Sequence, residues 1–459
     1  MAHVVEPEKR IPVIADVDVA VIGGGPGGLP AAIAAARHKA TTLLVERYGF
    51  LGGLATSGLI GPILGHRAHE SSTPILGGIP KELCLRMHEQ EGAPKWEDAL
   101  KQGGIPFDVE ILKHVADQMV EEAGVRVMFH TCFSDVIVED DEIKAVVVES
   151  KSGRQAIVAK VVIDATGDGD VAYRSGAPMK EGRPADGKSQ SMGTMFHIGG
   201  VENVSSEERK GAAEKIRKAV DAGELHAYNT GLGGHASTII QGQVSLNDTR
   251  FPGDATNVED LTRGEIQMRR DTLKIVDFLR KKVPAYKNCY LITTPAQIGV
   301  RQSRQIVGEA TLTGDDIVKG RKYKDSIARG SWWVDIHCPR GLVKRGVHLC
   351  YSKCPMKNCH MQKKYRDQLM DNIYPPKGDW YDIRYGCLVP KKVNNLLVSG
   401  RCISATHEAM AGARVIGTCM AIGQAAGTAA TQAVLAKKLP RELDVELLRQ
   451  TIIADGGVV

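Results

Sequence analysis

The chain opens with two short apolar runs separated by a longer stretch of small residues. Residues 18–22 read DVAVI and end at a cluster of glycines, residues 31–40 are rich in alanine, and residues 42–45 read TLLV. Short β-branched runs bounded by glycines are typical of buried strands, and a helix between two such strands completes a βαβ unit. The pattern therefore predicts the first unit of an α/β sheet.

Later hydrophobic patterns extend this sheet and then become mixed. Residues 186–385 carry mixed helices and strands, of which 260–282 is the clearest amphipathic helix, with its charges on a solvated face. The pattern before that region predicts, in chain order, a helix at 107–125, strands at 126–129 and 134–138, and a small antiparallel sheet from 142–149 and 156–163.

The turn after the first strand is built for a phosphate group. Gly23 permits the tight bend, Gly25 lets the backbone approach a pyrophosphate, and Gly28 lets helix and strand pack closely. Glu46 ends the second strand, where a carboxylate accepts hydrogen bonds from both hydroxyls of an adenosine ribose. We therefore predict a dinucleotide site that includes Gly23, Gly25, Pro26, Gly27, Gly28 and Glu46.

The residues beyond Glu46 favour FAD over NAD. Two glycines, Gly52 and Gly53, follow the second strand, and NAD dehydrogenases have no need of them. Residues 46–53 resemble the stretch that wraps the FAD diphosphate and ribitol in two-dinucleotide-binding-domain flavoproteins, and residues 165–170 resemble the second signature of that group. The resemblance places Phe133 near the adenine and implies these cofactor contacts: Arg47, Phe133, Ala165, Thr166, Gly167 and Asp168.

A small-residue segment near the C-terminus is expected to contact the flavin ring. A strand at 395–400 ends in glycine, and a helix rich in glycine and alanine follows, with a stop at Lys437. The dipole at the N-terminus of this helix would stabilise negative charge on the reduced flavin. The alternative, a membrane span, is disfavoured by Gln424 and the flanking charges. The predicted contacts are Gly400, Arg401, Arg414, Gly417 and Gly423.

Longer phrases make the resemblance specific. Residues 308–313 (GEATLT), 334–337 (VDIH), 387–390 (CLVP) and 399–408 (SGRCISATHE) resemble the FAD-dependent oxidoreductase family, and the likeness covers nearly the whole chain. It implies an α/β, Rossmann-like FAD-binding domain of the glutathione-reductase or fumarate-reductase type, with an inserted mixed α+β substrate domain. The implied boundaries are 1–185 for the first part of the FAD-binding domain, with a cap-like excursion at about 60–105, then 186–385 for the substrate domain and 386–459 for the second part.

Composition agrees with an ordinary globular protein, with 43% hydrophobic and 25% charged residues. The net charge of +5 comes from 59 basic and 54 acidic residues spread along the chain, which disfavours a nucleic-acid partner. No apolar signal segment opens the chain, so we expect a cytoplasmic protein without a membrane anchor. Ten cysteines in such a chain indicate reduced thiols, metal ligands or redox groups.

The substrate side needs a group that moves a proton and cations that polarise an oxygen. We predict Arg301, His337 and His407 as catalytic residues. Arg301 and Arg304 resemble an arginine pair of the family, although Arg304 could instead form a structural ion pair with Glu309. His66 and His69 are further candidates that could overhang the flavin.

Four cysteines gather in a basic segment, 338–360. Close spacing lets thiolates converge on one ion, so Cys338, Cys350, Cys354 and Cys359 could bind a [4Fe–4S] cluster or zinc. Their spacing is not a common cluster pattern, and reduced thiols remain the other interpretation.

The predicted function is an FAD-dependent oxidoreductase, a dehydrogenase or reductase that transfers hydride or electrons between flavin and a small organic substrate. Two alternatives stay open. One is an electron-transfer flavoprotein subunit with an iron–sulfur cluster and a redox partner protein; the other is an RNA-binding flavoprotein. The sequence leaves a homo-oligomer open.

Overall fold

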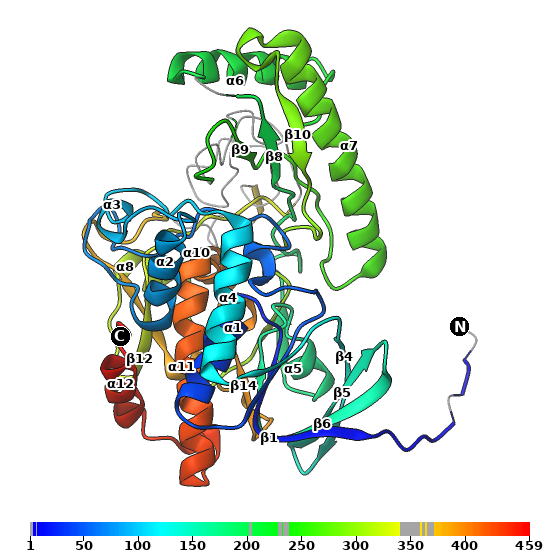
Figure 1. Cartoon of the computed structure of the whole chain (residues 1–459), viewed down its shortest axis with the longest axis vertical. Coiled ribbons are helices and arrows are strands. Elements are labelled where there is room, and N and C mark those ends of the chain that lie inside the picture. The colour runs from blue at the N-terminus through cyan, green and yellow to red at the C-terminus, as the bar shows by residue number, and fades with distance from the viewer. Residues whose placement is uncertain are drawn as a thin grey trace.

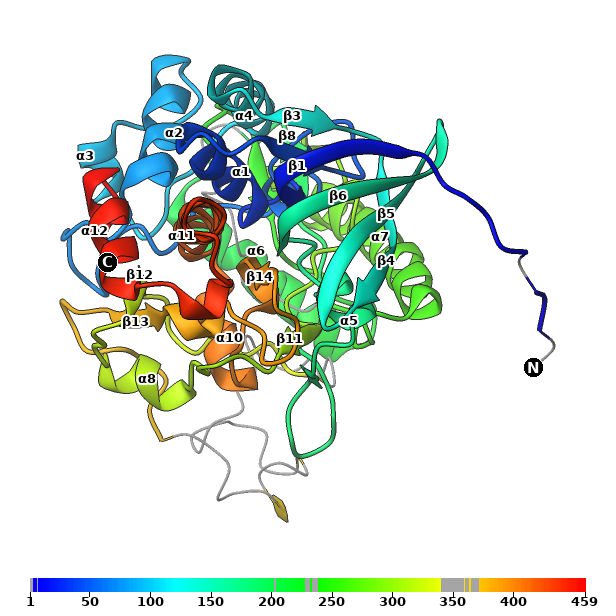
Figure 2. The same ribbon diagram turned by 90° about the horizontal axis from the view of Figure 1, so that it is seen from below.

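The structure is a computed structural model, and it describes residues 3–5, 7–201, 204–227, 232, 238–339, 359, 363–364 and 371–459. Its centre is a seven-stranded sheet in the order β3-β2-β1-β6-β5-β4, with β14 paired to β6 as well (Figures 1 and 2). The strands are β1 (Val13–Ile22), β2 (Thr42–Val45), β3 (Arg126–Met128), β4 (Cys132–Glu139), β5 (Glu142–Ser150), β6 (Gly153–Asp164) and β14 (Leu396–Val398).

Strand β6 has two partners along its length. Its first half pairs antiparallel with β5, and Val162 to Asp164 pair in parallel with β14. It also lies parallel to β1, which is twice as long as the predicted strand because Val13 to Val17 pair with the first half of β6. The parallel strands β1, β2, β6 and β14 therefore end at one edge of the sheet, where ligands bind in open α/β sheets.

One face of the sheet is covered by helices that lie close together. Helix α11 packs directly on α1 and α2, and α4 packs on α1 and α2 (Figure 1). A Cβ atom on Gly427 would lie 2.0 Å from the carbonyl oxygen of Ala31, so the α1–α11 contact needs glycine. These helices are α1 (Gly28–Arg37), α2 (Gly78–Glu89), α4 (Val109–Ala123) and α11 (Ile416–Ala436).

A second lobe stands beside the sheet domain and has its own core. Its three-stranded antiparallel sheet has the order β10-β8-β9, and helices α6 and α7 cover it (Figure 1). Phe196, Ile216, Leu279 and Tyr286 are fully buried there. The elements are β8 (Phe196–Gly199), α6 (Ser206–Asp221), β9 (Val244–Leu246), α7 (Val258–Lys282) and β10 (Tyr290–Thr293).

The rest of the predicted substrate region does not join that lobe. Residues such as Leu312, Ile327 and Tyr381 belong to the same buried cluster as α1 and α11, so this part packs into the domain of the seven-stranded sheet. The remaining elements are α3 (Trp96–Ala99), α5 (Asp170–Arg174), β7 (Met179–Glu181), β11 (Arg304–Ile306), α8 (Gly314–Lys319), β12 (Ser326–Gly330), β13 (Tyr381–Arg384), α10 (His407–Ala413) and α12 (Val445–Ala454). Within the described ranges, no helix is long and apolar enough to span a membrane.

Candidate functional site

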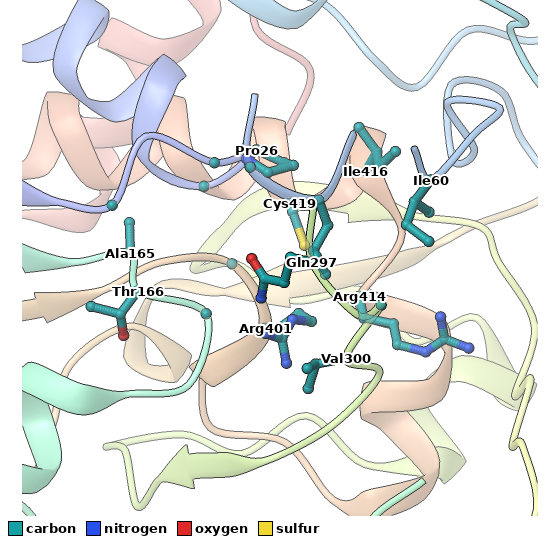
Figure 3. Close-up of a pocket in the computed structure, with 18 of the residues that line it drawn as sticks. Pro26, Ile60, Ala165, Thr166, Gln297, Val300, Arg401, Arg414, Ile416 and Cys419 are labelled. Carbon is teal, nitrogen blue, oxygen red and sulfur yellow. The ribbon is translucent and has the colours of Figure 1, made fainter. Parts of the chain in front are cut away.

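A cavity of about 340 Å³ lies at the edge where β1, β2, β6 and β14 end. Figure 3 shows Ala165 and Thr166 on one side of it, with Pro26, Ile416 and Ile60 along the upper wall. Sixteen of the predicted site residues line it: Gly23, Gly25, Pro26, Gly27, Glu46, Arg47, Gly53, Phe133, Ala165, Thr166, Gly167, Arg301, His337, Gly400, Arg401 and Arg414.

Three of the loop glycines, Gly23, Gly25 and Gly28, have different surroundings. Gly23 has a φ of 106°, and a Cβ there would lie 2.4 Å from the carbonyl oxygen of Ala165. A Cβ on Gly28 would lie 1.7 Å from the carbonyl oxygen of Gly23. At Gly25 the nearest atom would be Gly53 Cα at 3.5 Å, an ordinary contact, so the protein itself leaves room there. Gly25 is thus the position where a ligand can approach the backbone.

Glu46 anchors the loop from the end of β2. Its Oε2 accepts a hydrogen bond from the Gly24 N–H (2.8 Å), and its Oε1 accepts one from the Tyr48 N–H (3.0 Å). The side chain is 5% exposed and lines the cavity beside Thr131 and Phe133. Each carboxylate oxygen keeps a second lone pair, so the ribose hydroxyls can still donate to it.

A polar contact from the second lobe crosses the cavity near this end. Arg47 Nη2 and the Tyr48 hydroxyl both donate to Gln297 Oε1, at 2.6 and 3.0 Å. The Gln297 N–H in turn donates to the carbonyl oxygen of Ser57 (3.0 Å). This contact joins the two lobes over the predicted diphosphate stretch.

The segment after β6 is held by carboxylates. Asp164 is fully buried, and its side chain accepts hydrogen bonds from the N–H groups of Thr166 and Ala172. Asp168 accepts from Ser303 Oγ (2.6 Å) and from Arg401 Nη2 (3.1 Å) but does not line the cavity. Asp168 therefore orients Arg401, which does line it.

Helix α11 faces the cavity through its N-terminus. Val415, Ile416 and Cys419 line the wall, whereas Gly417 and Gly423 do not. A Cβ on Gly417 would lie 2.5 Å from the carbonyl oxygen of Leu64, and one on Gly423 would lie 2.3 Å from that of Gly27. These two glycines allow close packing of the helix against protein backbone rather than contact with a ligand.

The far end of the cavity holds a buried cationic cluster. Arg250 Nε and Nη2 lie 3.3 Å from His337 Nδ1, and His337 Nε2 lies 3.5 Å from Asp335 Oδ2. Arg414 Nη2 donates to the Asp335 carbonyl oxygen (3.1 Å) and lies 3.7 Å from its Oδ2. Arg301 Nη1 donates to the carbonyl oxygen of Ser191 (3.0 Å).

The cluster fixes the charge of its members. Burial lowers the pKa of His337 far below the usual range of histidine, with Arg301 and Arg250 acting in the same direction. Burial alone would raise the pKa of Asp335, but His337, Arg414 and Arg301 outweigh it, so the net shift is downward. At neutral pH the imidazole is therefore neutral and the carboxylate ionised. Because Arg250 donates to Nδ1, the proton of His337 resides on Nε2, toward Asp335.

Comparison with known proteins gives this site its family. The model of the FAD dependent oxidoreductase family matches residues 18–452. The chain belongs to this family.

Two curated relatives match about a third of the oxidoreductase. Thiamine thiazole synthase of Methanococcus maripaludis is 30% identical over 165 residues, which are 34% of this chain and 57% of that protein. The enzyme of the same name from Methanococcus vannielii is 29% identical over 163 residues, 33% of this chain and 56% of its own length. The matches thus span little more than half of these relatives.

Solved structures are similar over most of the chain. A geranylgeranyl bacteriochlorophyll reductase-like protein from Thermoplasma acidophilum has 15% identity, with 96% of this chain and 84% of that chain covered and a TM-score of 0.44. Glycine oxidase from Geobacillus kaustophilus has 10% identity, coverage of 92% and 95%, and a TM-score of 0.42.

The cavity of the oxidoreductase fits FAD. Gly25 leaves open backbone where a pyrophosphate would lie, and Glu46 offers oxygen lone pairs for the ribose. At the other end, Arg401 Nη1 and Arg414 Nε are buried donors without a hydrogen-bond partner in the described part of the chain. Carbonyl oxygens or nitrogens of a flavin ring are acceptors that could satisfy them.

Several candidate side chains of the oxidoreductase lie elsewhere. His407 is buried on α10 and does not line the cavity, so its position does not support a catalytic role. The proposed Arg304–Glu309 ion pair is wrong, because Arg304 pairs with Asp170 (2.9 Å) and Glu309 with Arg441 (3.9 Å).

His66 and His69 also lie away from the cavity and contact other parts of the protein. His66 Nε2 is 2.9 Å from the carbonyl oxygen of Ala99, and burial lowers the pKa of its imidazole. His69 stacks on Tyr374, with ring centroids 5.8 Å apart. Neither residue lines the cavity. Gly28 and Gly52 are likewise packed against loop backbone or side chains rather than lining it.

The metal prediction falls largely on residues that the structure does not describe. Cys350 and Cys354 lie outside the described residues, whereas Cys338 and Cys359 are buried. In the described ranges, no three side chains of His, Cys, Asp or Glu are arranged to hold an ion. The [4Fe–4S] and zinc hypotheses therefore gain no support and stay predictions, which iron, sulfide and zinc analysis of anaerobically purified protein would test.

Several residues that complete the far end of the cavity were not predicted from the sequence. Asn247 and Gln297 line it, and Arg250 lies directly behind His337. These residues belong to the second lobe, in segments without a motif. Residues 244–251 read VSLNDTRF, a mixed run of polar and apolar residues that does not by itself indicate a site.

Proposed function

We propose that this FAD-dependent oxidoreductase transfers a hydride between a small organic substrate and flavin N5. The observation that supports the proposal is one continuous cavity. It joins the dinucleotide loop and Glu46 to the buried Arg301, Asp335 and His337, so that cofactor and substrate groups would meet in the same cavity. A water-poor, preorganised site strengthens the electrostatic interactions that hydride transfer needs.

FAD, when bound, supplies the acceptor or donor of the two electrons. The residues of the chain would bind the cofactor and orient it toward the substrate. Glu46 would hold the ribose, and N–H groups at the start of α1 would hold the phosphates. Arg401 and the N-terminus of α11 offer positive charge beside the ring position.

Asp335 is the side chain best suited to accept a hydrogen bond from the substrate. Its Oδ1 is buried and has no hydrogen-bond partner within the described ranges. An ionised carboxylate with a vacant lone pair accepts a hydrogen bond from a substrate hydroxyl or amino group. His337 does not act as the base in this arrangement, because its Nδ1 lone pair accepts from Arg250. It instead fixes the orientation of Asp335 through Nε2.

The proposal is tested by anaerobic flavin reduction. FAD-loaded wild type and Asp335→Asn are mixed with a panel of small alcohols, amines and hydroxy acids, and the loss of oxidised-flavin absorbance is followed. A compound that reduces the wild type should reduce the variant at least about tenfold more slowly, since a charge-assisted hydrogen bond contributes about 1.5–3 kcal/mol. For the reductase direction, chemically reduced enzyme is mixed with the oxidised compounds. Equal rates in both proteins would refute the role of Asp335 and of this cavity.

A further inference from the structure

A carboxylate behind the cavity wall moderates a positive charge that faces the cofactor. We propose that Asp168 is a positioning residue which, through Arg401, lowers the reduction potential of the bound flavin. This inference rests on the proposed function, because it needs FAD in the cavity that Arg401 lines.

Arg401 has one nitrogen bound to protein and one that is available to a ligand. Its Nη2 donates to Asp168 Oδ1 at 3.1 Å, whereas its Nη1 is buried and has no hydrogen-bond partner in the part of the chain that the structure describes. Arg401 lines the cavity (Figure 3), and Asp168 does not. A buried N–H without a partner is costly, so the vacant Nη1 favours an acceptor on the ligand.

Asp168 is in turn held by a second donor. Ser303 Oγ donates to the same oxygen, Asp168 Oδ1, at 2.6 Å, and Ser303 is only 4% exposed. On the guanidinium side, a Cβ on Gly167 would lie 2.8 Å from Arg401 Nη2, so the backbone of this loop packs closely against the arginine. These contacts restrict both members of the ion pair and fix how Arg401 is presented to the cavity.

The ion pair determines how much positive charge a flavin in the cavity would experience. The side chains of Arg401 and Asp168 are 11% and 15% exposed, so water screens their charges only weakly. Reduction adds negative charge to a flavin ring, which the guanidinium stabilises and the carboxylate behind it disfavours. Asp168 therefore offsets part of the effect of Arg401 and keeps the reduction potential low.

The test compares the reduction potentials of FAD-loaded proteins, measured anaerobically against a reference dye without any substrate. Asp168→Asn removes the charge and keeps an oxygen acceptor, Ser303→Ala loosens the carboxylate and keeps both charges, and Arg401→Gln removes the cation. The control is Asp277→Asn, which removes a carboxylate from a side chain that is 55% exposed on α7. FAD content and melting temperature are determined first for every protein, so loss of cofactor or of folding is recognised separately.

The expected shifts have opposite signs for the two members of the pair. A neighbouring charge changes the pKa of a group by about 1–3 units, and flavin reduction, which also creates charge, responds to the same field. Arg401→Gln should shift the equilibrium at least about tenfold toward oxidised flavin, which lowers the potential of this two-electron couple by about 30 mV. Asp168→Asn should shift it at least about threefold toward reduced flavin, which raises the potential by about 14 mV. Ser303→Ala should shift it less than Asp168→Asn, and Asp277→Asn by less than about twofold, because exposed charges contribute little.

An unchanged or lowered potential in Asp168→Asn would overturn the proposal, and so would an equal rise in Ser303→Ala or in Asp277→Asn. If Asp168→Asn does not retain FAD, Arg401→Gln decides, since an unchanged potential there overturns the proposal and a lowered one supports it. Failure of FAD to bind to the wild type would refute the proposed function as well. Unchanged potentials in proteins that hold FAD would refute only the role of Asp168.

Discussion

Two glycines of one loop should respond to the same substitution in opposite ways. Gly25→Ala adds a methyl group whose nearest protein atom is Gly53 Cα at 3.5 Å, and Gly28→Ala adds one that is 1.7 Å from the Gly23 carbonyl oxygen. Contacts below 3.0 Å are essentially never seen, so the second substitution forces a movement of at least 3.0 − 1.7 = 1.3 Å between loop and helix. The first should spare the fold and harm cofactor binding.

The magnitudes follow from these contacts. Overpacking of a close contact costs about 1–3 kcal/mol, and the gain of up to about 1 kcal/mol from replacing a helical glycine offsets it only in part. Gly28→Ala should therefore lower the free energy of unfolding of the apoprotein by about 1–2 kcal/mol. Gly25→Ala should change it by less than about 0.5 kcal/mol, yet weaken FAD binding at least about tenfold, which equals about 1.4 kcal/mol.

Urea unfolding of the apoproteins and fluorescence titration with FAD measure both quantities. Each variant serves as the control for the other, since the two share loop, residue type and substitution. If Gly25→Ala bound FAD as tightly as the wild type, the pyrophosphate would not pass this glycine, and the assignment of the cavity would be wrong.

Three further predictions address other parts of the molecule. Glu46→Gln should weaken FAD binding about tenfold or more, measured by fluorescence titration, because the amide replaces a charged acceptor by a neutral one; unchanged affinity would exclude a ribose contact. Gly423→Ala should lower the melting temperature of the apoprotein, because its methyl group would lie 2.3 Å from the Gly27 carbonyl oxygen; an unchanged temperature would show that α11 can move away. Burial lowers the pKa of His407 to about 3, below its unfolded value of about 6.5. Between these two values the unfolded state binds a proton that the folded state does not bind, so the free energy of unfolding falls as the pH drops through this window. Between pH 7 and 5 the loss should be about 2 kcal/mol in urea unfolding and should be much smaller in His407→Leu; an equal loss in both proteins would contradict the assignment.

Local patterns predicted the fold class and the succession of the first strands and helices along the chain. The fold class and the family are confirmed. They could be predicted because strand, glycine loop, helix and terminal acid all lie within residues 18–46. The exact bounds of strands and helices could not be predicted in this way, because contacts with other residues determine where an element begins. Strand β1 extends to Val13 only because β6 offers a partner, and α7 begins at Val258 because Asn257 caps it, two residues before the predicted start.

The site likewise has one part that could be predicted from the sequence and one part that could not. The ADP half depends on a motif with fixed spacing, so its lining could be predicted from the sequence. The substrate half is assembled from three separate segments, around Arg250, Arg301 and His337, and hydrogen bonds between side chains 87 residues apart in the chain have no local signature. The partner of Arg304 was mispredicted for the same reason, since Asp170 lies 134 residues away.

We propose that FAD occupies the cavity between Glu46 and Arg301. The most direct measurement is the flavin content of purified protein after incubation with excess FAD and removal of the unbound cofactor, read from the FAD released on denaturation. We expect FAD equimolar with the wild-type chain and a clear loss of FAD in Gly25→Ala. Wild-type protein that is folded yet retains no FAD would contradict it.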